Sequence, residues 1–286
     1  MIPAAFDYAR PATLDEALAM LQQNPEAKVL AGGHSLLPLM KLRLASPPLL
    51  IDLGRIPGLT YIREDGQAVR IGALTTHAEI ERSPIVARHF AALVQAAEAI
   101  GDLQVRNRGT IGGSLAHADP AADYPAAVLA LEAVIHVRGP QGARSIPADG
   151  FFTGLYQTAL QPGELITEVE VPIPPRVTGS AYRKMKHPAS GFAVVGAAAV
   201  VRVGPDGREQ RVRLAFTGVG PHAYRAKAVE AALRGKRIDE ATVAEAVRQA
   251  TDGVEVLEDL FADAEYRAHL ARVYGKRALL AAAQPS

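Results

Sequence analysis

The sequence has no cysteine and no tryptophan among its 286 residues. Without cysteine, the chain forms no disulfide, ligates no iron–sulfur cluster and holds no cysteine-type zinc site. Its eight histidines are scattered and lack the paired spacing of a metalloprotease helix or another metal signature. We therefore expect no metal site in this chain, and any redox chemistry requires a bound organic cofactor.

The sequence also has no large excess of charge of one sign and no long hydrophobic run. The 31 Lys and Arg residues nearly cancel the 30 Asp and Glu residues, so nucleic acid and anionic membranes are not expected partners. The longest apolar stretch, 192–201, is well short of the roughly 18 residues of a membrane helix, and residues 1–7 do not resemble a signal peptide. We expect a cytoplasmic protein without direct membrane insertion, which only its partners would bring to a membrane.

What is present indicates about two folded domains. Hydrophobic residues make up 49% and charged residues 21%, as in an ordinary globular protein. Helical and strand patterns alternate up to the cluster Pro172-Ile173-Pro174-Pro175, which predicts a domain boundary between 175 and 176. Beyond it, a run of strands precedes a run of helices, which is typical of an α+β domain. The expected strands are 180–186, 192–203 and 211–218, and the expected helices are 225–234, 239–251 and 263–282.

Within the first domain, the form Thr13-Leu14-Asp15-Glu16 predicts a capping box at the start of a helix over 13–23. The pattern over 105–123 has no periodicity, and we expect a long irregular segment there, which would favour a functional role. Other expected strands are 28–31, 49–53, 68–72, 134–137 and 168–171, and other expected helices are 76–82 and 84–100.

Two glycine pairs follow a similar pattern. Gly32 and Gly33 come directly after an expected buried strand, and Gly112 and Gly113 stand between hydroxyl residues in a second expected turn. Adjacent glycines allow a tight bend and leave the backbone amides open to a close ligand, so the two turns could hold the two phosphates of a dinucleotide. Neither turn matches the Rossmann or the Walker pattern.

The longer motifs around these glycines resemble one protein family. Residues 31–41, AGGHSLLPLMK, and 110–123, TIGGSLAHADPAAD, closely resemble the FAD-binding medium subunits of molybdenum hydroxylases. The carbon monoxide dehydrogenase type is the nearer relative, and the xanthine dehydrogenase flavin domain is a more distant one. The resemblance covers nearly the whole chain.

The resemblance implies an α+β fold with FAD as the cofactor. The FAD-binding domain, 1–175, would be of the PCMH (vanillyl-alcohol-oxidase-like) type, with two α/β subdomains at about 1–54 and 55–175. The second domain, 176–286, would resemble the carbon monoxide dehydrogenase flavoprotein C-terminal domain, with a three-stranded antiparallel sheet and helices. The positions that match FAD contacts of the family are Lys28, Val29, Leu30, Ala31, Gly32, Gly33, His34, Ser35, Ile100, Gly101, Thr110, Ile111, Gly112, Gly113, Ser114, His117, Asp123, Ile166, Lys184 and Phe192.

Alternative roles stay open for several of these residues. Asp123 would accept a hydrogen bond from a sugar hydroxyl or a ring N–H, or else act as a helix N-cap before Pro125. Phe192 would cover one flavin face, or else belong to the core at the start of a strand. We expect His34 and His117 to bond backbone or phosphate more than to donate protons, since the redox chemistry belongs to the flavin.

A lysine near the flavin would stabilise the negative charge of its reduced form. Lys184 matches the family's flavin-contacting lysine, with Lys186 as the alternative. The family often has an acidic residue before the aromatic position, and this chain has Gly191 there, so the acid is absent and the choice between Lys184 and Lys186 stays open.

In function, the resemblance implies an electron-transfer subunit. A large molybdenum-cofactor subunit would oxidise the substrate, a small two-cluster iron–sulfur subunit would relay electrons, and this chain's FAD would pass them to quinone, NAD or oxygen. The family assembles as a dimer of heterotrimers. Carbon monoxide, a purine, an N-heterocycle or an aldehyde are all open as substrates. The alternatives are a stand-alone flavin-dependent oxidoreductase of the same fold and a nucleotide-binding module without redox activity.

Overall fold

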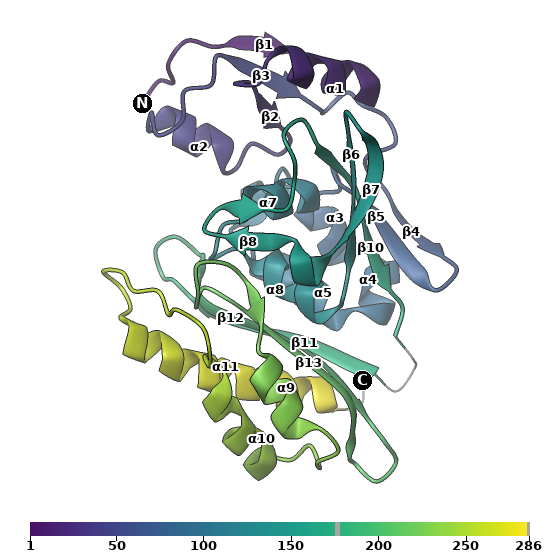
Figure 1. Ribbon diagram of the computed structural model, residues 1–286, viewed down its shortest axis with the longest axis vertical. Helices are drawn as coiled ribbons and strands as arrows, with labels where there is room; N and C mark the ends of the chain where they lie inside the picture. Colours follow the sequence, from purple (N-terminus) through teal and green to yellow (C-terminus); the bar gives the residue numbers. More distant parts are fainter. Residues whose placement is uncertain (175–177, 285–286) are drawn as a thin grey trace.

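The computed structural model describes residues 1–174 and 178–284. The chain forms three stacked parts, with the N-terminal subdomain at the top of Figure 1 and the C-terminal domain at the bottom. The boundary expected between 175 and 176 lies outside the described residues. No helix within the described ranges combines the length and the apolar character needed to cross a membrane.

The first subdomain is a small parallel sheet with two helices. Its strands run in the order β1 (Asp7–Ala9), β3 (Leu49–Asp52) and β2 (Lys28–Leu30), and the helices are α1 (Leu14–Gln23) and α2 (Leu36–Lys41). Thr13 caps α1 by accepting from the Glu16 N–H. The Glu16 carboxylate, however, accepts from the Ala12 N–H at 2.8 Å and not from the cap residue itself, so the expected capping box is shifted by one position.

The second subdomain has an antiparallel sheet with helices on one side (Figure 1). The strand order is β4-β5-β10-β6-β7, with β4 at Ile62–Asp65, β5 at Ala68–Gly72, β10 at Leu165–Pro172, β6 at Val134–Gly139 and β7 at Gly142–Pro147. A short turn η1 (Ala148–Gly150) leads to the hairpin β8 (Phe152–Gly154) and β9 (Gln157–Thr158). The helices are α3 (His77–Arg82), α4 (Pro84–His89), α5 (Ala91–Ala99), α6 (Leu103–Arg106), α7 (Ile111–His117) and α8 (Asp123–Ala130).

Two expectations for this region are wrong. The helix expected over 84–100 is two helices, because Phe90 leaves the helical conformation with φ −139° between α4 and α5. The segment 105–123 is largely ordered, and the second glycine pair lies in the first turn of α7 rather than in a loop. Thr110 caps this helix through the Gly113 N–H, and Gly112 lets it pack closely because a Cβ there would lie 2.7 Å from the Ala73 carbonyl oxygen.

The C-terminal domain has a four-stranded antiparallel sheet, not the three-stranded one expected. Its fourth strand has only two residues, which is too short to produce a sequence pattern. The order is β11 (Thr178–Lys186), β12 (Ala193–Val203), β13 (Glu209–Thr217) and β14 (Tyr224–Arg225). The helices are α9 (Lys227–Leu233), α10 (Glu240–Ala246) with the turn η2 (Val247–Gln249), and the long α11 (Ala264–Ala283).

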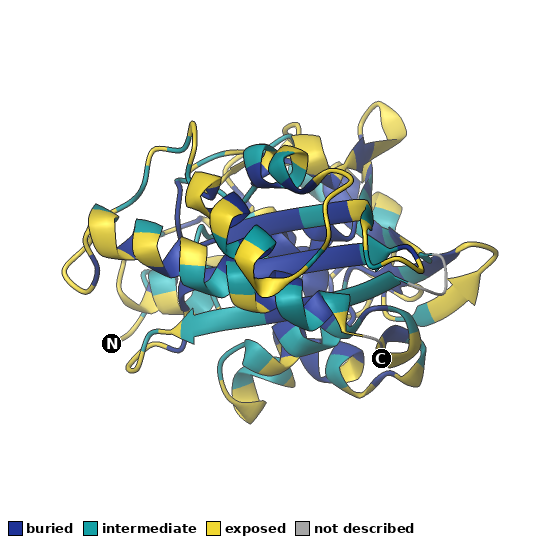
Figure 2. Cartoon of the chain, turned by 90° about the horizontal axis from the view of Figure 1, so that it is seen from below, coloured by how far each residue is buried: buried dark blue, intermediate teal, exposed yellow. Residues whose placement is uncertain are grey.

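This sheet is buried on both faces. Tyr182, Ala198 and Val200 belong to the same core as the helices of the second subdomain. Their neighbours Ala199 and Val201 point the other way, into the core beneath α11. Figure 2 shows the buried strands lying behind half-exposed helices. The apolar run over 192–201 is therefore a strand covered on two sides, which explains why it lacks a polar alternation.

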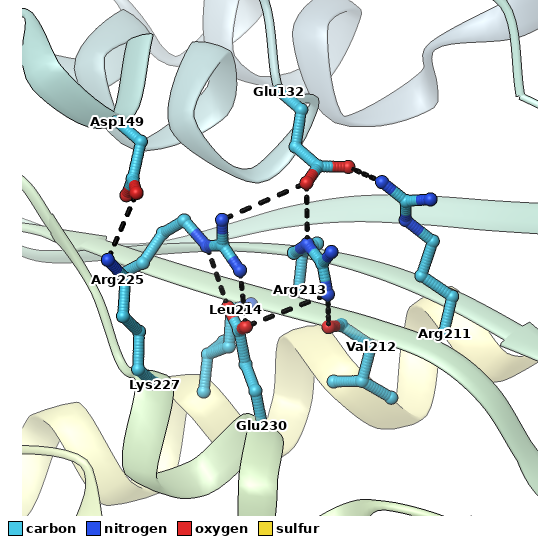
Figure 3. Close-up of polar contacts among 9 residues, drawn as sticks. All are labelled: Glu132, Asp149, Arg211, Val212, Arg213, Leu214, Arg225, Lys227 and Glu230. Atoms are coloured by element: carbon cyan, nitrogen blue, oxygen red, sulfur yellow. Dashed lines mark hydrogen bonds and ion pairs between the residues drawn. The ribbon is translucent and has the colours of Figure 1, made fainter. Parts of the chain in front are cut away.

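A polar cluster joins the two domains at their edge (Figure 3). Glu132, which follows α8 and has φ 54°, accepts from Arg211 and from Arg213 Nε at 2.8 Å on β13. Glu230 of α9 accepts from Arg225 at 2.5 Å. Burial opposes ionisation of Glu132, but the hydrogen bonds from Arg213 and Arg211 outweigh it and hold the pKa of Glu132 below its usual value. The carboxylate is therefore more stable in the folded protein than in the unfolded chain.

We expect Glu132→Gln to lower the free energy of unfolding by about 1 kcal/mol at pH 7, since the pair is partly exposed and screened. Because the pKa is depressed on folding, this contribution is present above the unfolded value of about 4.5 and is lost as pH falls through the folded pKa. Urea unfolding of both proteins from pH 7 to pH 3 should show the difference shrinking. Glu245→Gln, at an exposed pair with Arg248, is the control and should change little. A constant difference across this range would contradict the assignment.

Candidate functional site

The two glycine motifs lie against each other. A Cβ added at Gly32 would overlap the Arg108 carbonyl oxygen, just before Gly109 and the cap of α7. On the other side, a Cβ at Gly113 would lie 3.8 Å from the Ala31 Cβ. Two segments about eighty residues apart in sequence thus form one cradle, and glycine is required where their backbones touch.

The free hydrogen-bond donors of this cradle come from the first motif. Within the described ranges, no acceptor is bonded to the backbone N–H groups of Gly32, Gly33, His34 and Ser35. Gly33 has φ +77°, a conformation that L side chains rarely adopt and that turns successive amides to one side. In contrast, the Gly112 N–H donates to the Ala73 carbonyl at 2.9 Å, and the Gly113 N–H donates to Thr110. The two motifs therefore differ in role: the first exposes amides, and the second packs beside them.

His77 supports the cradle through its contacts with Gly109, and it was not among the expected site residues. The backbone N–H of His77 donates to the Gly109 carbonyl at 3.0 Å, and a Cβ at Gly109 would overlap the Nε2 atom of the His77 ring. The side chain is buried, and this burial, assisted by His34 and Arg106, lowers the pKa of His77 to about 4. The imidazole is thus neutral at neutral pH. The only signal was the capping box of Thr76 and Glu79, which fixes the start of α3.

Asp123 and Lys184, expected as separate ligand contacts, form a buried pair with each other. Asp123 Oδ1 accepts from the Tyr182 hydroxyl at 2.6 Å, and Lys184 Nζ lies 2.9 Å from the same carboxylate. Lys184 also donates to the Ala99 carbonyl at 2.9 Å. Asp123 is the first residue of α8 and Ala122 is its N-cap, so the alternative role of Asp123 as an N-cap is wrong.

The pair fixes a charged group at the junction of the two domains. Burial raises the pKa of Asp123 and lowers that of Lys184, while their mutual attraction opposes both shifts. Gly196 provides the room, because a Cβ there would overlap the Tyr182 hydroxyl. Strand alternation places Tyr182 and Lys184 on one face, which was the available signal for including Tyr182.

Other expected contacts gather beside this pair. Ala99, whose carbonyl binds Lys184, directly precedes Ile100 and Gly101, and a Cβ at Gly191 would lie 3.9 Å from the Gly101 Cα. Phe192 is 45% exposed, so the alternative of a core phenylalanine is wrong. Lys186 is exposed, whereas the Lys184 ammonium is bonded to the Ala99 carbonyl and to the Asp123 carboxylate.

The remaining expected residues are more scattered. Ile166 is buried in the core of the second subdomain on β10, and Lys28 is exposed at the start of β2. His34 is exposed on the first motif. His117, at the end of α7, packs against Tyr156 with ring centroids 5.2 Å apart. Whether these residues contact FAD stays a prediction.

One group has the composition of a metal site. His136, Glu168 and Glu170 offer ligand atoms that lie within 4.8 Å of one another on the five-stranded sheet. A guanidinium already takes the position of a cation there, since Arg70 lies 2.6 Å from Glu168 Oε1 and 2.8 Å from Glu170 Oε2. The group is an ion-pair network across strands β5, β10 and β6.

Removing one member of the buried pair should be costly. We expect Lys184→Met to reduce the free energy of unfolding by about 3 kcal/mol, because it leaves the Asp123 carboxylate buried without its counter-charge. The double variant with Asp123→Asn should recover part of this loss, as expected for coupled residues. Urea unfolding of the four proteins gives the coupling directly. Additive effects of the two changes would contradict a direct pair.

The arrangement as a whole suits an extended ligand with a phosphate end and a ring end. The exposed amides of the first motif and the hydroxyls of Ser35, Thr110 and Ser114 suit phosphate oxygens. The buried ammonium of Lys184 and the exposed ring of Phe192 suit an aromatic system that gains negative charge.

Comparison with known proteins shows the family of both domains. Residues 4–174 match the model described as "FAD binding domain in molybdopterin dehydrogenase", and residues 180–282 match the "CO dehydrogenase flavoprotein C-terminal domain". The carbon monoxide dehydrogenase medium chain of Hydrogenophaga pseudoflava is 45% identical over 99% of this chain and 98% of its own length. The 6-hydroxypseudooxynicotine dehydrogenase complex subunit alpha of Paenarthrobacter nicotinovorans is 38% identical, over 98% and 95% of the two chains.

The solved structures agree with the sequence relatives. A chain of carbon monoxide dehydrogenase from Hydrogenophaga pseudoflava superposes with a TM-score of 0.95 at 48% identity, covering 99% of this chain and 98% of that one. FAD is accordingly the cofactor, and the alternative of a nucleotide-binding module without redox activity is set aside. The chain belongs to the FAD-binding medium subunits of the molybdenum hydroxylases, the carbon monoxide dehydrogenase and xanthine dehydrogenase family.

Proposed function

We propose that this chain holds FAD in the glycine cradle and beside the Asp123–Lys184 pair, and transfers electrons from an iron–sulfur subunit to an external acceptor. The observation that carries the proposal is the meeting of the two glycine motifs around four unbonded amides. The bound flavin supplies the redox chemistry, taking up and releasing electrons and protons. The residues of the chain bind and orient the flavin.

Each part of the site has a separate task in this proposal. The amides of 32–35 bind the pyrophosphate, and Thr110 and Ser114 border the ribityl chain. Lys184 contributes a fixed positive charge near the ring, which favours its reduced, negatively charged form. Because Asp123 and Ala99 hold the ammonium in place, little reorganisation is needed when that charge develops. Phe192 covers one face of the ring.

The partners follow from the relatives and from the composition. The relatives named above are medium chains or subunits of multi-subunit enzymes, which supports a complex over the stand-alone oxidoreductase. The chain has no cysteine to ligate a cluster, so we assign the two clusters to a small iron–sulfur subunit and the molybdenum cofactor to a large one. The dimer of heterotrimers is proposed from the family resemblance.

The substrate is determined outside this chain. Carbon monoxide and 6-hydroxypseudooxynicotine appear in the names of two relatives that match over nearly the full length. Such different molecules share one type of flavin subunit, which supports substrate binding by the large subunit. We assign no substrate to the complex on the basis of this subunit.

The cradle can be tested with two alanine variants of matched backbone strain. Gly33→Ala should weaken FAD binding about tenfold or more, since it strains a positive φ and crowds the exposed amides. Gly235→Ala, at φ +67° with no atom within 4 Å of the added Cβ, imposes similar strain away from the site and should keep normal binding. Flavin absorbance after gel filtration with FAD measures retention. Equal retention in both variants would sink the proposed cradle.

The partners can be tested by purification from the native host. A tagged chain should bring down two further polypeptides, with molybdenum and iron in the eluate and flavin absorbance. Tagged Gly33→Ala should bring down the same polypeptides with less flavin. A chain that purifies alone, holds flavin and turns over a substrate by itself would favour the stand-alone oxidoreductase.

A further inference from the structure

Next to the proposed flavin site, a histidine, a carboxylate and a tyrosine meet at the surface. His117 is the last residue of α7, Asp119 lies two positions further, and Tyr156 lies between β8 and β9. The Tyr156 hydroxyl donates to Asp119 Oδ2 at 3.4 Å, and His117 Nε2 lies 4.0 Å from the same oxygen. With the ring contact between His117 and Tyr156, these three residues form what we call the His117 cluster.

The backbone is strained on both sides of this cluster. Ala118 has φ 49° and Tyr156 has φ 54°, two of the four non-glycine residues with positive φ in the described part of the chain. Ala118 ends α7 in this conformation, where glycine is the usual residue, and Tyr156 adopts it between β8 and β9, so both residues are costly there. Such strain persists only where surrounding contacts impose it, and it is concentrated at functional positions.

The cluster is linked to the ring end of the proposed site. Asp119 Oδ1 accepts from the Ala121 N–H at 2.8 Å, and the Ala121 carbonyl accepts from the Ala193 N–H at 3.2 Å, directly after Phe192. His117 lies four residues beyond Gly113 on α7, or about 6 Å along the helix axis. The segment 119–121 therefore connects the cluster to the start of β12, directly after Phe192.

The chemistry of the cluster is that of a proton donor open to solvent. Tyr156 is 53% exposed, and Leu155 beside it is 51% exposed, so an apolar surface borders the polar group. Burial and the neighbouring Asp119 raise the pKa of Tyr156, which keeps its hydroxyl protonated at neutral pH. The hydrogen bond from Tyr156 to Asp119 is long, at 3.4 Å, and this length is compatible with a proton-transfer group in a protein without its ligand.

We propose that the His117 cluster protonates the external electron acceptor, and that this acceptor belongs to the quinone class. The inference rests on the proposed function. A quinone needs two electrons and two protons to become a hydroquinone. With reduced FAD bound, the quinone would receive a hydride, which carries both electrons and one proton, and its second proton would come from the Tyr156 hydroxyl. Tyr156 then regains a proton from solvent through Asp119 and His117. A nicotinamide takes only a hydride and would have no use for this donor.

Acceptors that differ in proton demand test this role. The native complex carrying Tyr156→Phe or Asp119→Asn is photoreduced without oxygen and mixed with a water-soluble benzoquinone, with ferricyanide or with ferrocenium. Quinone reduction should slow by about a hundredfold, as expected when a proton donor is lost. Oxidation by the two metal complexes takes up no proton, and their opposite charges control for electrostatic effects. Their rates, normalised to flavin content, should stay within about twofold of the unmodified complex.

Tyr8→Phe is the matched control. Tyr8 is also 53% exposed and donates to a carboxylate, that of Asp52, on the first subdomain. It should change no rate. If the cluster variants slow all acceptors equally, or slow none, the inference is overturned and the cluster only supports the hairpin. A complex without flavin absorbance before mixing would instead overturn the proposed function.

Discussion

The structure depends on burying an ion pair between two parts of the chain that are distant in sequence. Asp123 begins α8 in one domain, and Lys184 and Tyr182 lie on β11 of the other. Neither charge would be tolerated alone at this depth, so the two domains are stabilised together at this contact. The pair also holds the Lys184 ammonium through Asp123 and the Ala99 carbonyl, and in the proposed function this charge lies beside the flavin ring.

Small residues make that arrangement possible. Gly196 leaves space for the Tyr182 hydroxyl, and Gly32 and Gly109 leave space for the contact between the two motifs and for His77. In each case the missing Cβ lets a polar or backbone group approach another closely. The site is thus formed by close backbone contact, with few side chains specialised for chemistry.

The sequence predicted the order of elements well and the contacts poorly. Strong periodicity located α1, β5, β12 and α11 within a few residues, because burial on a face leaves a pattern. It failed over 105–123, where glycines and polar residues hid the short helices α6 and α7, and at the two-residue strand β14. The glycine motifs were visible in sequence. Their contact, the pairing of Asp123 with Lys184 and the position of His77 depend on long-range packing, which local patterns do not contain.

The two-sided burial of β12 also bears on how the chain acquires its structure during synthesis. Ala198 and Val200 complete a core that otherwise consists mainly of residues before position 172. The FAD-binding part therefore leaves the ribosome with an open apolar face, which closes only when the next strands arrive. The opposite face of the same strands packs against α11 in the second core. The sequence matches two domain models, one before and one after 174–180, but the shared strand β12 predicts that the two domains fold together.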